Sequence, residues 1–507
     1  MAVEVHALHE RKSKTTTLRR ACPNCDVLHH CSSPEVRINH PWAPGIYLSV
    51  VPVTKHADRL QFEGDGPVVD GAVKMRRLPE SVTLRSRLHD GTLDASDLQR
   101  VARRIAAIHQ NAAPAVEDAA TKAVDTSRRH LDDNSTSANQ LPEAVIDRRV
   151  LDRIKALSAE WLDRCSDLLQ KRADLGWIRD VHGDLQLEHV FYFLEHSPSG
   201  DIVIIDGIEF DPGLRRIDVP ADIAFLTMEL SFVGRRDLAR VFADAYFAES
   251  GDTAGKTIRP LFATYRSGVR AKVAAILGTE PEIPQVDRES ARIRSRGHWL
   301  WCLSELESPG RRPALVLVSG LPGTGKSTLS RSLAENSQFE LIRSDVVRKE
   351  IFASETTSAN SGRLYTADRT QQVYDDCLKH ARQKLLVGGR VIVDATIQRE
   401  KDRQAFLQLA IECGSWAAWI ECTASPEITK QRIDARRGDA SDADWSIYQL
   451  VKERWEQPSE LSKRFQAAIE TGQSSELAAS AAFAALRKWG DSRLIEIATH
   501  PGQVDQD

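Results

Sequence analysis

Residues 314–327 read Ala-Leu-Val-Leu-Val-Ser-Gly-Leu-Pro-Gly-Thr-Gly-Lys-Ser, and they hold two patterns in succession. The first five residues are a continuous apolar run, which predicts a strand buried in a parallel sheet. Residues 320–327 match the pattern G-x-x-x-x-G-K-[ST] of a phosphate-binding P-loop. The next residues, Thr328-Leu-Ser-Arg-Ser-Leu, predict a helix. Strand, loop and helix in this order are the context that the motif requires, so the chain is predicted to bind a nucleotide.

The chemistry of the P-loop assigns a role to each of its residues. Glycines let the backbone N–H groups turn inward around phosphate oxygens, and the helix N-terminus adds its positive end. Lys326 is predicted to reach the β- and γ-phosphates, and the Ser327 hydroxyl to ligate Mg²⁺. The residues predicted to bind ATP are Gly320, Gly323, Thr324, Gly325, Lys326, Ser327 and Thr328.

Two carboxylates downstream favour a kinase over an ATPase motor. Asp345, in Ile-Arg-Ser-Asp-Val-Val-Arg, shares a face of a helix start with Arg348, where a second strand should end. A carboxylate there can orient or deprotonate an acceptor hydroxyl. Asp394 ends the predicted strand Val391-Ile-Val and suits a metal or acceptor contact at the carboxyl edge of the sheet. The alternative for both residues is capping or turn chemistry.

Arginines further along the chain suit a lid over the phosphates. Arg432 and Arg436 lie one turn apart in Gln-Arg-Ile-Asp-Ala-Arg-Arg, and Arg437 follows. Paired guanidinium groups on a movable segment can neutralise the transferring phosphoryl group. Without the P-loop, a solvated helix face would be the better interpretation of these arginines.

The stretches GLPGTGKST, IRSDVVRKE, VIVDAT and QRIDARRGDASDADW resemble the small P-loop kinases that include gluconate kinase, chloramphenicol phosphotransferase and the 5′-polynucleotide kinases. The resemblance covers about 180 residues, which read as a doubly wound α/β domain. It implies that Asp345 is the acceptor-side carboxylate and that Arg432, Arg436 and Arg437 belong to the lid. The matching stretches are common to several acceptor classes, so the acceptor stays open.

The first half carries a second pair of carboxylates. Asp184 lies in Val-His-Gly-Asp-Leu-Gln-Leu-Glu-His-Val, and Asp206 ends the predicted strand 201–206. Two such carboxylates can converge on Mg-ATP, one as base and one as metal ligand. The stretch resembles the aminoglycoside phosphotransferase and choline kinase families, which read H-G-D-x-x-x-x-N. This resemblance implies that Asp184 is the base, that Asp206 is the metal ligand, and that His182 and Asp222 support the loop.

Both resemblances together cover about residues 35–490, and the whole resembles the bacterial bifunctional aminoglycoside phosphotransferase/ATP-binding proteins. Two features depart from the kinase pattern. His189 stands where the pattern has the metal-binding Asn, and imidazole is a poorer match for Mg²⁺. Residues 1–34 offer no convincing strand bearing the phosphate-clamping Lys. Glu35 is a candidate for the helix Glu, whereas Lys74 reads as part of a hinge strand. The N-terminal kinase-like domain is therefore predicted to have an incomplete N-lobe.

The composition of the chain limits which partners and which cellular compartments are expected. The chain has 507 residues and a net charge of −4, which argues against nucleic acid as a partner. No apolar run reaches the ~18 residues of a membrane helix, and the first residues lack a signal-peptide core. The 8 cysteines are sparse, which suggests a reducing, cytoplasmic compartment. Cys22, Cys25 and Cys31 with His29 or His30 could hold Zn²⁺, but their spacing fits no common zinc motif, and a disordered leader is favoured.

The predicted organisation is an α+β kinase-like domain followed by an α/β P-loop domain. Its segments are an irregular leader at 1–34, a kinase-like domain at 35–290, a helix and linker at 291–312, a P-loop kinase domain at 313–490 and a tail at 491–507. Within the first domain, Ser96 or Asp97 is expected to cap a helix through His109, and residues 111–142 are expected to form a connection. The predicted function is ATP-dependent phosphoryl transfer to a small hydroxylated acceptor. The alternatives are a nucleotide-driven regulatory or binding protein and a nucleic-acid end kinase.

Overall fold

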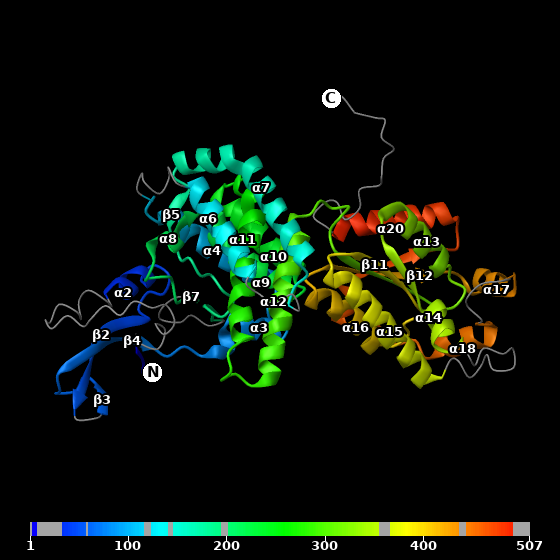
Figure 1. The fold of residues 1–507 in the computed structure, drawn as a ribbon, viewed down its shortest axis with the longest axis horizontal. Helices are drawn as coiled ribbons and strands as arrows, with labels where there is room; N and C mark the ends of the chain where they lie inside the picture. The colour runs from blue at the N-terminus through cyan, green and yellow to red at the C-terminus, as the bar shows by residue number, and fades with distance from the viewer. Residues whose placement is uncertain are drawn as a thin grey trace. The chain divides into compact units, whose positions relative to one another are not determined.

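The structure is a computed structural model, which describes residues 3–7, 33–56, 59–115, 123–139, 145–193, 201–353, 366–435 and 443–489. The chain divides into two compact units. The first contains residues 1–130 and 161–266, and the second contains residues 131–160 and 267–507. Figure 1 shows the elements of both. Cys22, Cys25, Cys31 and the neighbouring histidines, Arg436, Arg437 and the predicted tail lie outside the described residues.

The second unit contains a five-stranded sheet in the order β10-β11-β9-β12-β13, in which every neighbouring pair is parallel. β9 is the central strand, and all six of its residues are buried because both faces of the sheet are covered. The strands are β9 (Ala314–Ser319), β10 (Glu340–Arg343), β11 (Arg390–Asp394), β12 (Trp416–Thr423) and β13 (Gln466–Glu470). This sheet agrees with the predicted doubly wound P-loop domain.

Helices cover the two faces of this sheet. α13 and α20 pack together on one face, and α15 and α16 pack together on the other (Figure 1). The helices of this part are α13 (Lys326–Ser337), α14 (Ser344–Ile351), α15 (Ala367–Leu386), α16 (Glu400–Glu412), α17 (Pro426–Ala435), α18 (Trp445–Glu453), α19 (Glu460–Lys463) and α20 (Ser475–Trp489). α12 (Gln285–Leu306) packs against α16. On β12, the neighbour of the P-loop strand, Trp419 is buried and its Nε1 donates a 2.6 Å hydrogen bond to Ser319 Oγ.

The first unit begins with an antiparallel four-stranded sheet in the order β1-β4-β2-β3. Its strands are β1 (Val3–Ala7), β2 (Tyr47–His56), β3 (Arg59–Phe62) and β4 (Val68–Arg76), with α2 (Ser33–Asn39) between β1 and β2. The sequence predicted an irregular leader at 1–34, whereas the structure places β1 there, paired with β4. The alternation of Val-Glu-Val-His-Ala explains the difference, because period-2 patterning suits an outer strand. Lys74 lies on β4 and pairs with Glu63 at 3.1 Å.

The other described elements of the first unit are helices and two short antiparallel strand pairs. The helices are η2 (Glu80–Val82), α3 (Leu84–His89), α4 (Ala95–Asn111), α8 (Pro212–Arg215), α9 (Val219–Phe232) and α10 (Arg236–Ser250), with α7 (Arg148–Asp174) and α11 (Gly255–Leu277) shared between the units. The paired strands are β5 (Ile178–Asp180) with β8 (Arg216–Asp218), and β6 (Val190–Tyr192) with β7 (Ile202–Ile204).

Two local predictions in this region were wrong. The N-cap of α4 is Asp94, not Ser96 or Asp97, because Asp94 and Asp97 form reciprocal side-chain to backbone hydrogen bonds. Part of the expected connection at 111–142 is a helix, α6 (Ala123–Asn139). Its Ser, Asn and Asp content disfavours helix by local propensity. Tertiary contacts such as the burial of Leu131 and Asn134 outweigh that propensity. Among the described residues, none of the helices has the length and apolar character that crossing a membrane requires.

Two candidate active sites

The P-loop turns sharply between β9 and α13. Gly320 has φ +141°, and a Cβ at this position would lie 2.4 Å from the carbonyl oxygen of Cys422. Gly325 has φ +82° and stands at the N-cap of α13 in the left-handed region. Glycine is needed at both positions for these reasons. The Lys326 ammonium donates a 2.9 Å hydrogen bond to the carbonyl oxygen of Leu321, so it folds back over the loop.

Asp394 is a buried carboxylate next to the P-loop residues Lys326 and Ser327. It ends β11, is 4% exposed, and accepts a 3.3 Å contact from the Arg343 guanidinium. Burial raises the pKa of Asp394, while Lys326, a hydrogen bond with Ser327 and Arg343 act in the opposite direction. The predicted Mg²⁺ ligands Ser327 and Asp394 therefore touch each other. The contact follows from the fold, because β9 and β11 are parallel neighbours and end at the same edge.

One cavity of about 490 Å³ collects most of the predicted residues of this half. Its walls include Gly323, Gly325, Lys326, Ser327, Thr328, Asp345, Arg348 and Arg432. Gly320, Thr324 and Asp394 do not line it, although Thr324 and Asp394 contact residues around it. Arg432 Nη2 donates a 2.6 Å hydrogen bond to the carbonyl oxygen of Thr471, which anchors the predicted lid arginine beside the loop that follows β13.

Several residues of this cavity were not predicted from the sequence, including Thr370, Tyr374, Gln398, Arg454 and Thr471. Burial raises the pKa of Tyr374 to about 12, and the Tyr374 hydroxyl accepts a 3.1 Å hydrogen bond from the N–H of Ile397. The Glu456 N–H donates to the carbonyl oxygen of Gln398 at 3.0 Å, which brings the segment after α18 against the loop after β11. No motif marks these residues, because they come from separate helices and loops that only the fold brings together.

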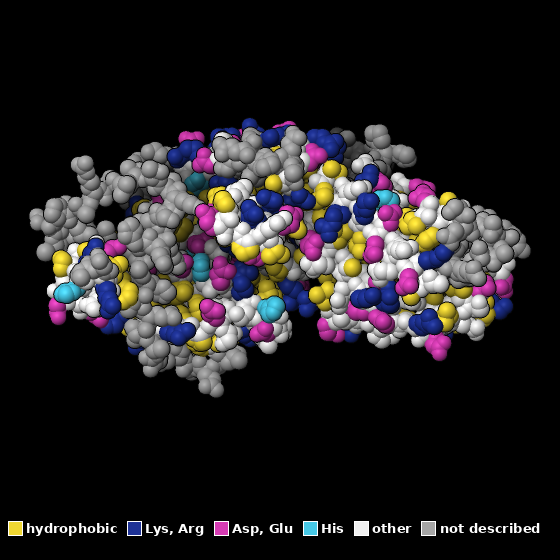
Figure 2. Space-filling view, turned by 60° about the horizontal axis from the view of Figure 1, so that its bottom comes forward, with side chains coloured by type: hydrophobic (Ala, Val, Ile, Leu, Met, Phe, Trp, Pro, Cys, Tyr) yellow, Lys and Arg dark blue, Asp and Glu magenta, His cyan; other side chains and the backbone are white. Residues whose placement is uncertain are grey.

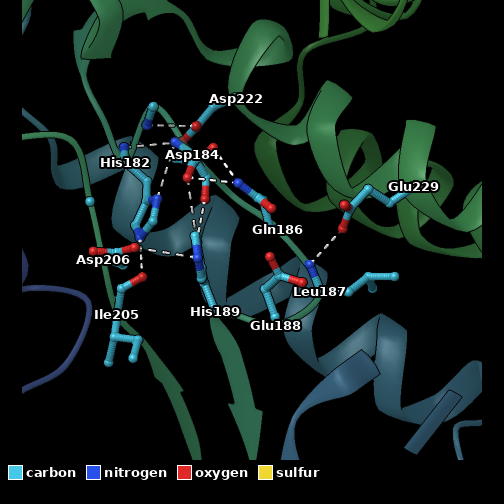
Figure 3. A network of polar contacts seen from close by, with 12 residues as sticks. His182, Asp184, Gln186, Leu187, Glu188, His189, Ile205, Asp206, Asp222 and Glu229 are labelled. Carbon is cyan, nitrogen blue, oxygen red and sulfur yellow. Dashed lines mark hydrogen bonds and ion pairs between the residues drawn. The ribbon is translucent and has the colours of Figure 1, made fainter. Parts of the chain in front are cut away.

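The second site lies in the first unit, on the loop before β6 (Figure 3). The buried Asp222 of α9 accepts hydrogen bonds from the N–H groups of His182, at 3.1 Å, and Gly183, at 2.8 Å. His109 Nε2 lies 3.1 Å from the same carboxylate, and Tyr246 hydrogen-bonds His109 Nδ1 at 2.8 Å. Burial alone would raise the pKa of Asp222, but the bond and charge of His109 bring it below its ordinary value.

Three predicted residues of this loop region meet in space. Ligand atoms of Asp184, His189 and Asp206 all lie within 4.8 Å of one another. His189 Nε2 is 3.4 Å from Asp206 Oδ2, and His189 Nδ1 is 2.9 Å from the carbonyl oxygen of Asp184. The Gln186 amide donates to both carboxylate oxygens of Asp184 at 2.8 Å. Asp206 adopts φ +69°, a left-handed conformation in which Asp is more common than most residues.

Comparisons with known proteins agree with the P-loop assignment. The family described as "AAA domain" matches residues 315–458. The uncharacterized proteins Mb2027c of Mycobacterium bovis and Rv2004c of Mycobacterium tuberculosis are each 31% identical over 389 residues, which are 75% of this chain and 74% of theirs.

Solved structures also match the chain, at low scores. A sugar kinase from Janibacter sp. HTCC2649 is 17% identical with a TM-score of 0.29, over 37% of this chain and 99% of its own. A gluconokinase from Sinorhizobium meliloti 1021 is 19% identical with a TM-score of 0.28, over 35% of this chain and 94% of its own.

Proposed function

We propose that this chain is an ATP-dependent kinase for a small hydroxylated molecule. The chain belongs to the same family as the uncharacterized mycobacterial proteins Mb2027c and Rv2004c. The C-terminal unit is its catalyst. The observation that carries this proposal is the cavity on which the P-loop, Asp345 and Arg432 converge. A carboxylate facing the phosphate-binding loop suits transfer to a hydroxyl, because the hydroxyl must give up its proton to a nearby base.

In this proposal the protein acts by positioning and by charge. The P-loop N–H groups and Lys326 would hold the β- and γ-phosphates, and Arg432 lines the same cavity. The Ser327 hydroxyl and the Asp394 carboxylate are hard oxygen donors of the kind that Mg²⁺ takes, so they fit that ion. Bound Mg²⁺ would neutralise charge on the phosphate oxygens. Asp345 orients the acceptor hydroxyl and accepts its proton.

The N-terminal unit has two possible roles. By its resemblance to aminoglycoside phosphotransferases, Asp184 is a base and Asp206 with His189 holds a metal. One observation favours the second role, a ligand-binding module that regulates the P-loop unit. The Gln186 amide engages both oxygens of Asp184, and these are the oxygens a base would offer to an acceptor hydroxyl. In that role the P-loop unit would hydrolyse ATP slowly to ADP and free phosphate, without transfer to an acceptor.

A nucleic-acid end kinase is the third candidate, because those kinases share the P-loop logic. The net charge of −4 disfavours it. Figure 2 shows Lys and Arg side chains interspersed with Asp and Glu on one face of the described chain, without a continuous basic surface. An oligonucleotide with a free 5′-hydroxyl belongs in the acceptor panel for this reason.

An acceptor screen followed by phosphorus NMR tests the proposal. The full chain is incubated with Mg-ATP and sugars, sugar acids, aminoglycosides, nucleosides or the oligonucleotide, in parallel with the variants Lys326→Ala, Asp345→Asn and Asp184→Ala. We expect a phosphorylated product from the parent and from Asp184→Ala, and none from Lys326→Ala. The Asp345→Asn rate should fall by roughly 10²–10⁴-fold, which is the usual contribution of a general base.

Two outcomes of this screen would reject the assignment. ATP loss that yields only free phosphate with every acceptor would support the regulatory protein instead. Product formation that survives Lys326→Ala and disappears in Asp184→Ala would move the chemistry to the N-terminal unit. ATP binding to each variant, measured by calorimetry, separates a lost catalytic group from a lost nucleotide site.

A further inference from the structure

Asp184, His189 and Asp206 form a compact donor cluster, which we call the Asp-His-Asp cluster. Each side chain is partly buried, with 25%, 13% and 25% of it exposed, so the cluster is sheltered but open to solvent ions. Asp184 and His189 come from the loop before β6, and Asp206 follows β7. Because β6 and β7 pair antiparallel, the residues at this end of the hairpin are brought side by side.

The orientation of the His189 ring leaves one nitrogen directed at a carboxylate. His189 Nδ1 lies 2.9 Å from the carbonyl oxygen of Asp184, which can only accept, so Nδ1 carries the proton. In the neutral ring Nε2 then presents a lone pair to Asp206 Oδ2 at 3.4 Å. Two acceptors that face each other repel unless a cation lies between them. A histidine whose other N–H donates to a backbone carbonyl is also the usual arrangement of a metal ligand.

Separate parts of the unit hold this geometry in place. The Asp206 N–H donates to the Tyr47 hydroxyl at 2.9 Å, and the Gly207 N–H donates to Asn39 Oδ1 at 2.8 Å. Asp222 fixes the other side of the cluster through the backbone of His182 and Gly183. The cluster is therefore preorganised by β2, α2 and α9, which lowers the cost of ordering the ligands when an ion binds.

The donor set does not suit the ion that a kinase-like site implies. Mg²⁺ prefers oxygen ligands in octahedral geometry and keeps several waters. An imidazole nitrogen with carboxylates suits Zn²⁺, Fe²⁺, Co²⁺ or Ni²⁺, which bind nitrogen donors more strongly. We propose that the Asp-His-Asp cluster binds a divalent transition-metal ion in preference to Mg²⁺. The cluster belongs to the first unit and the P-loop to the second, so the inference holds or fails independently of the proposed kinase function.

Metal binding to the nucleotide-free full chain tests this inference. The background carries Cys22→Ser, Cys25→Ser and Cys31→Ser, so that thiols do not compete for the ion. Co²⁺ and Mg²⁺ are titrated separately by calorimetry into this protein and into His189→Asn, which keeps a polar side chain with an oxygen donor. His89→Asn, an exposed histidine of α3, is the matched control, and Lys326→Ala tests for a contribution from the P-loop.

We expect one Co²⁺ site that binds at least about tenfold more tightly than Mg²⁺. His189→Asn should weaken Co²⁺ by at least about tenfold, the lower end of what losing even a supporting partner of a metal ligand costs. His89→Asn and Lys326→Ala should keep the Co²⁺ affinity. Far-UV circular dichroism and the thermal midpoint of His189→Asn establish that it is folded, and Asp206→Asn, which must also lose the site, is the second variant.

Equal affinity for Co²⁺ and Mg²⁺, or Co²⁺ binding that is unchanged in both folded variants, would overturn the inference. The absence of saturable Co²⁺ binding to the parent would overturn it as well.

Discussion

Replacing Arg172 by methionine is expected to destabilise the N-terminal unit by about 3–5 kcal/mol, the usual cost of removing one partner from a buried ion pair. The Arg172 side chain is 2% exposed and bridges Asp218 and Asp252, each 1% exposed, through four hydrogen bonds of 2.5–2.8 Å. Methionine fills the space but leaves two carboxylates buried without their cation. Asp218 directly precedes α9, so the loss should also reach Asp222 and the loop it holds.

The pH dependence separates charge loss from packing loss. Burial raises the pKa of Asp218 to about 6, although Arg172 opposes this shift. A carboxyl with a raised folded pKa stabilises the protein below its unfolded pKa of about 4, and that stability is lost as the pH rises through about 6. Without Arg172 the carboxyl should take up a proton more readily. The Arg172→Met cost should therefore be smaller at about pH 5 than at about pH 8.

Hydrogen exchange measured by mass spectrometry on peptides of α9 and the 178–193 segment gives the local unfolding free energy. Arg128→Met removes an exposed pair with Asp163, 46% and 68% exposed, and should cost about 0–1 kcal/mol. Adding Asp218→Asn and Asp252→Asn to Arg172→Met should recover most of the stability, because no buried charge remains. A loss below about 1 kcal/mol in Arg172→Met, or no recovery in the triple variant, would refute the reasoning.

Three further predictions concern the C-terminal unit. Gly320→Ala should abolish ATP binding measured by calorimetry, because the added Cβ would lie 2.4 Å from the carbonyl oxygen of Cys422. The control Gly91→Ala, with open space around it, should cost only about 1–2 kcal/mol of stability. Normal nucleotide affinity in Gly320→Ala would contradict this. Asp345→Asn should keep ATP affinity while product formation falls, and an equal loss of both would make Asp345 a nucleotide ligand. Burial lowers the pKa of His298 to about 3. Between about pH 6.5 and pH 3, His298 therefore stays neutral in the folded state, whereas it is protonated in the unfolded chain. The free energy of unfolding should thus decline as the pH falls from about 6.5 to about 3, and His298→Leu should flatten this decline; an unchanged slope would exclude His298 as its cause.

Patterns that are local in the sequence predicted the elements around the P-loop. The apolar run at 314–318 predicted a buried strand, and the motif after it predicted the turn and the helix. Asp394 was identified from its position at a strand end, and parallel pairing of β9 with β11 places it beside Ser327. Such inferences succeed because neighbouring parallel strands end at one edge, so a strand-end residue is placed by topology alone.

Other features depended on contacts between distant residues. Asp94, Ser96 and Asp97 are all acceptable caps by type, and reciprocal hydrogen bonds selected Asp94. The polar sequence of α6 predicted a connection, but the segment is helical because the burial of Leu131 and Asn134 outweighs its low helix propensity. Five alternating residues are too short to predict a strand alone, and β1 forms one because it pairs with β4.

The sequence by itself determined the phosphate-binding loop, the class of its domain and the residues of the loop around Asp184, because each rests on residues that are close in the chain. Only the tertiary structure decided what those residues contact. It placed His189 Nε2 against Asp206, set Gln186 on both oxygens of Asp184, and assembled the cavity wall from Tyr374, Gln398 and Arg454. Ring orientation and donor geometry are set by packing among distant segments, and no local pattern encodes them.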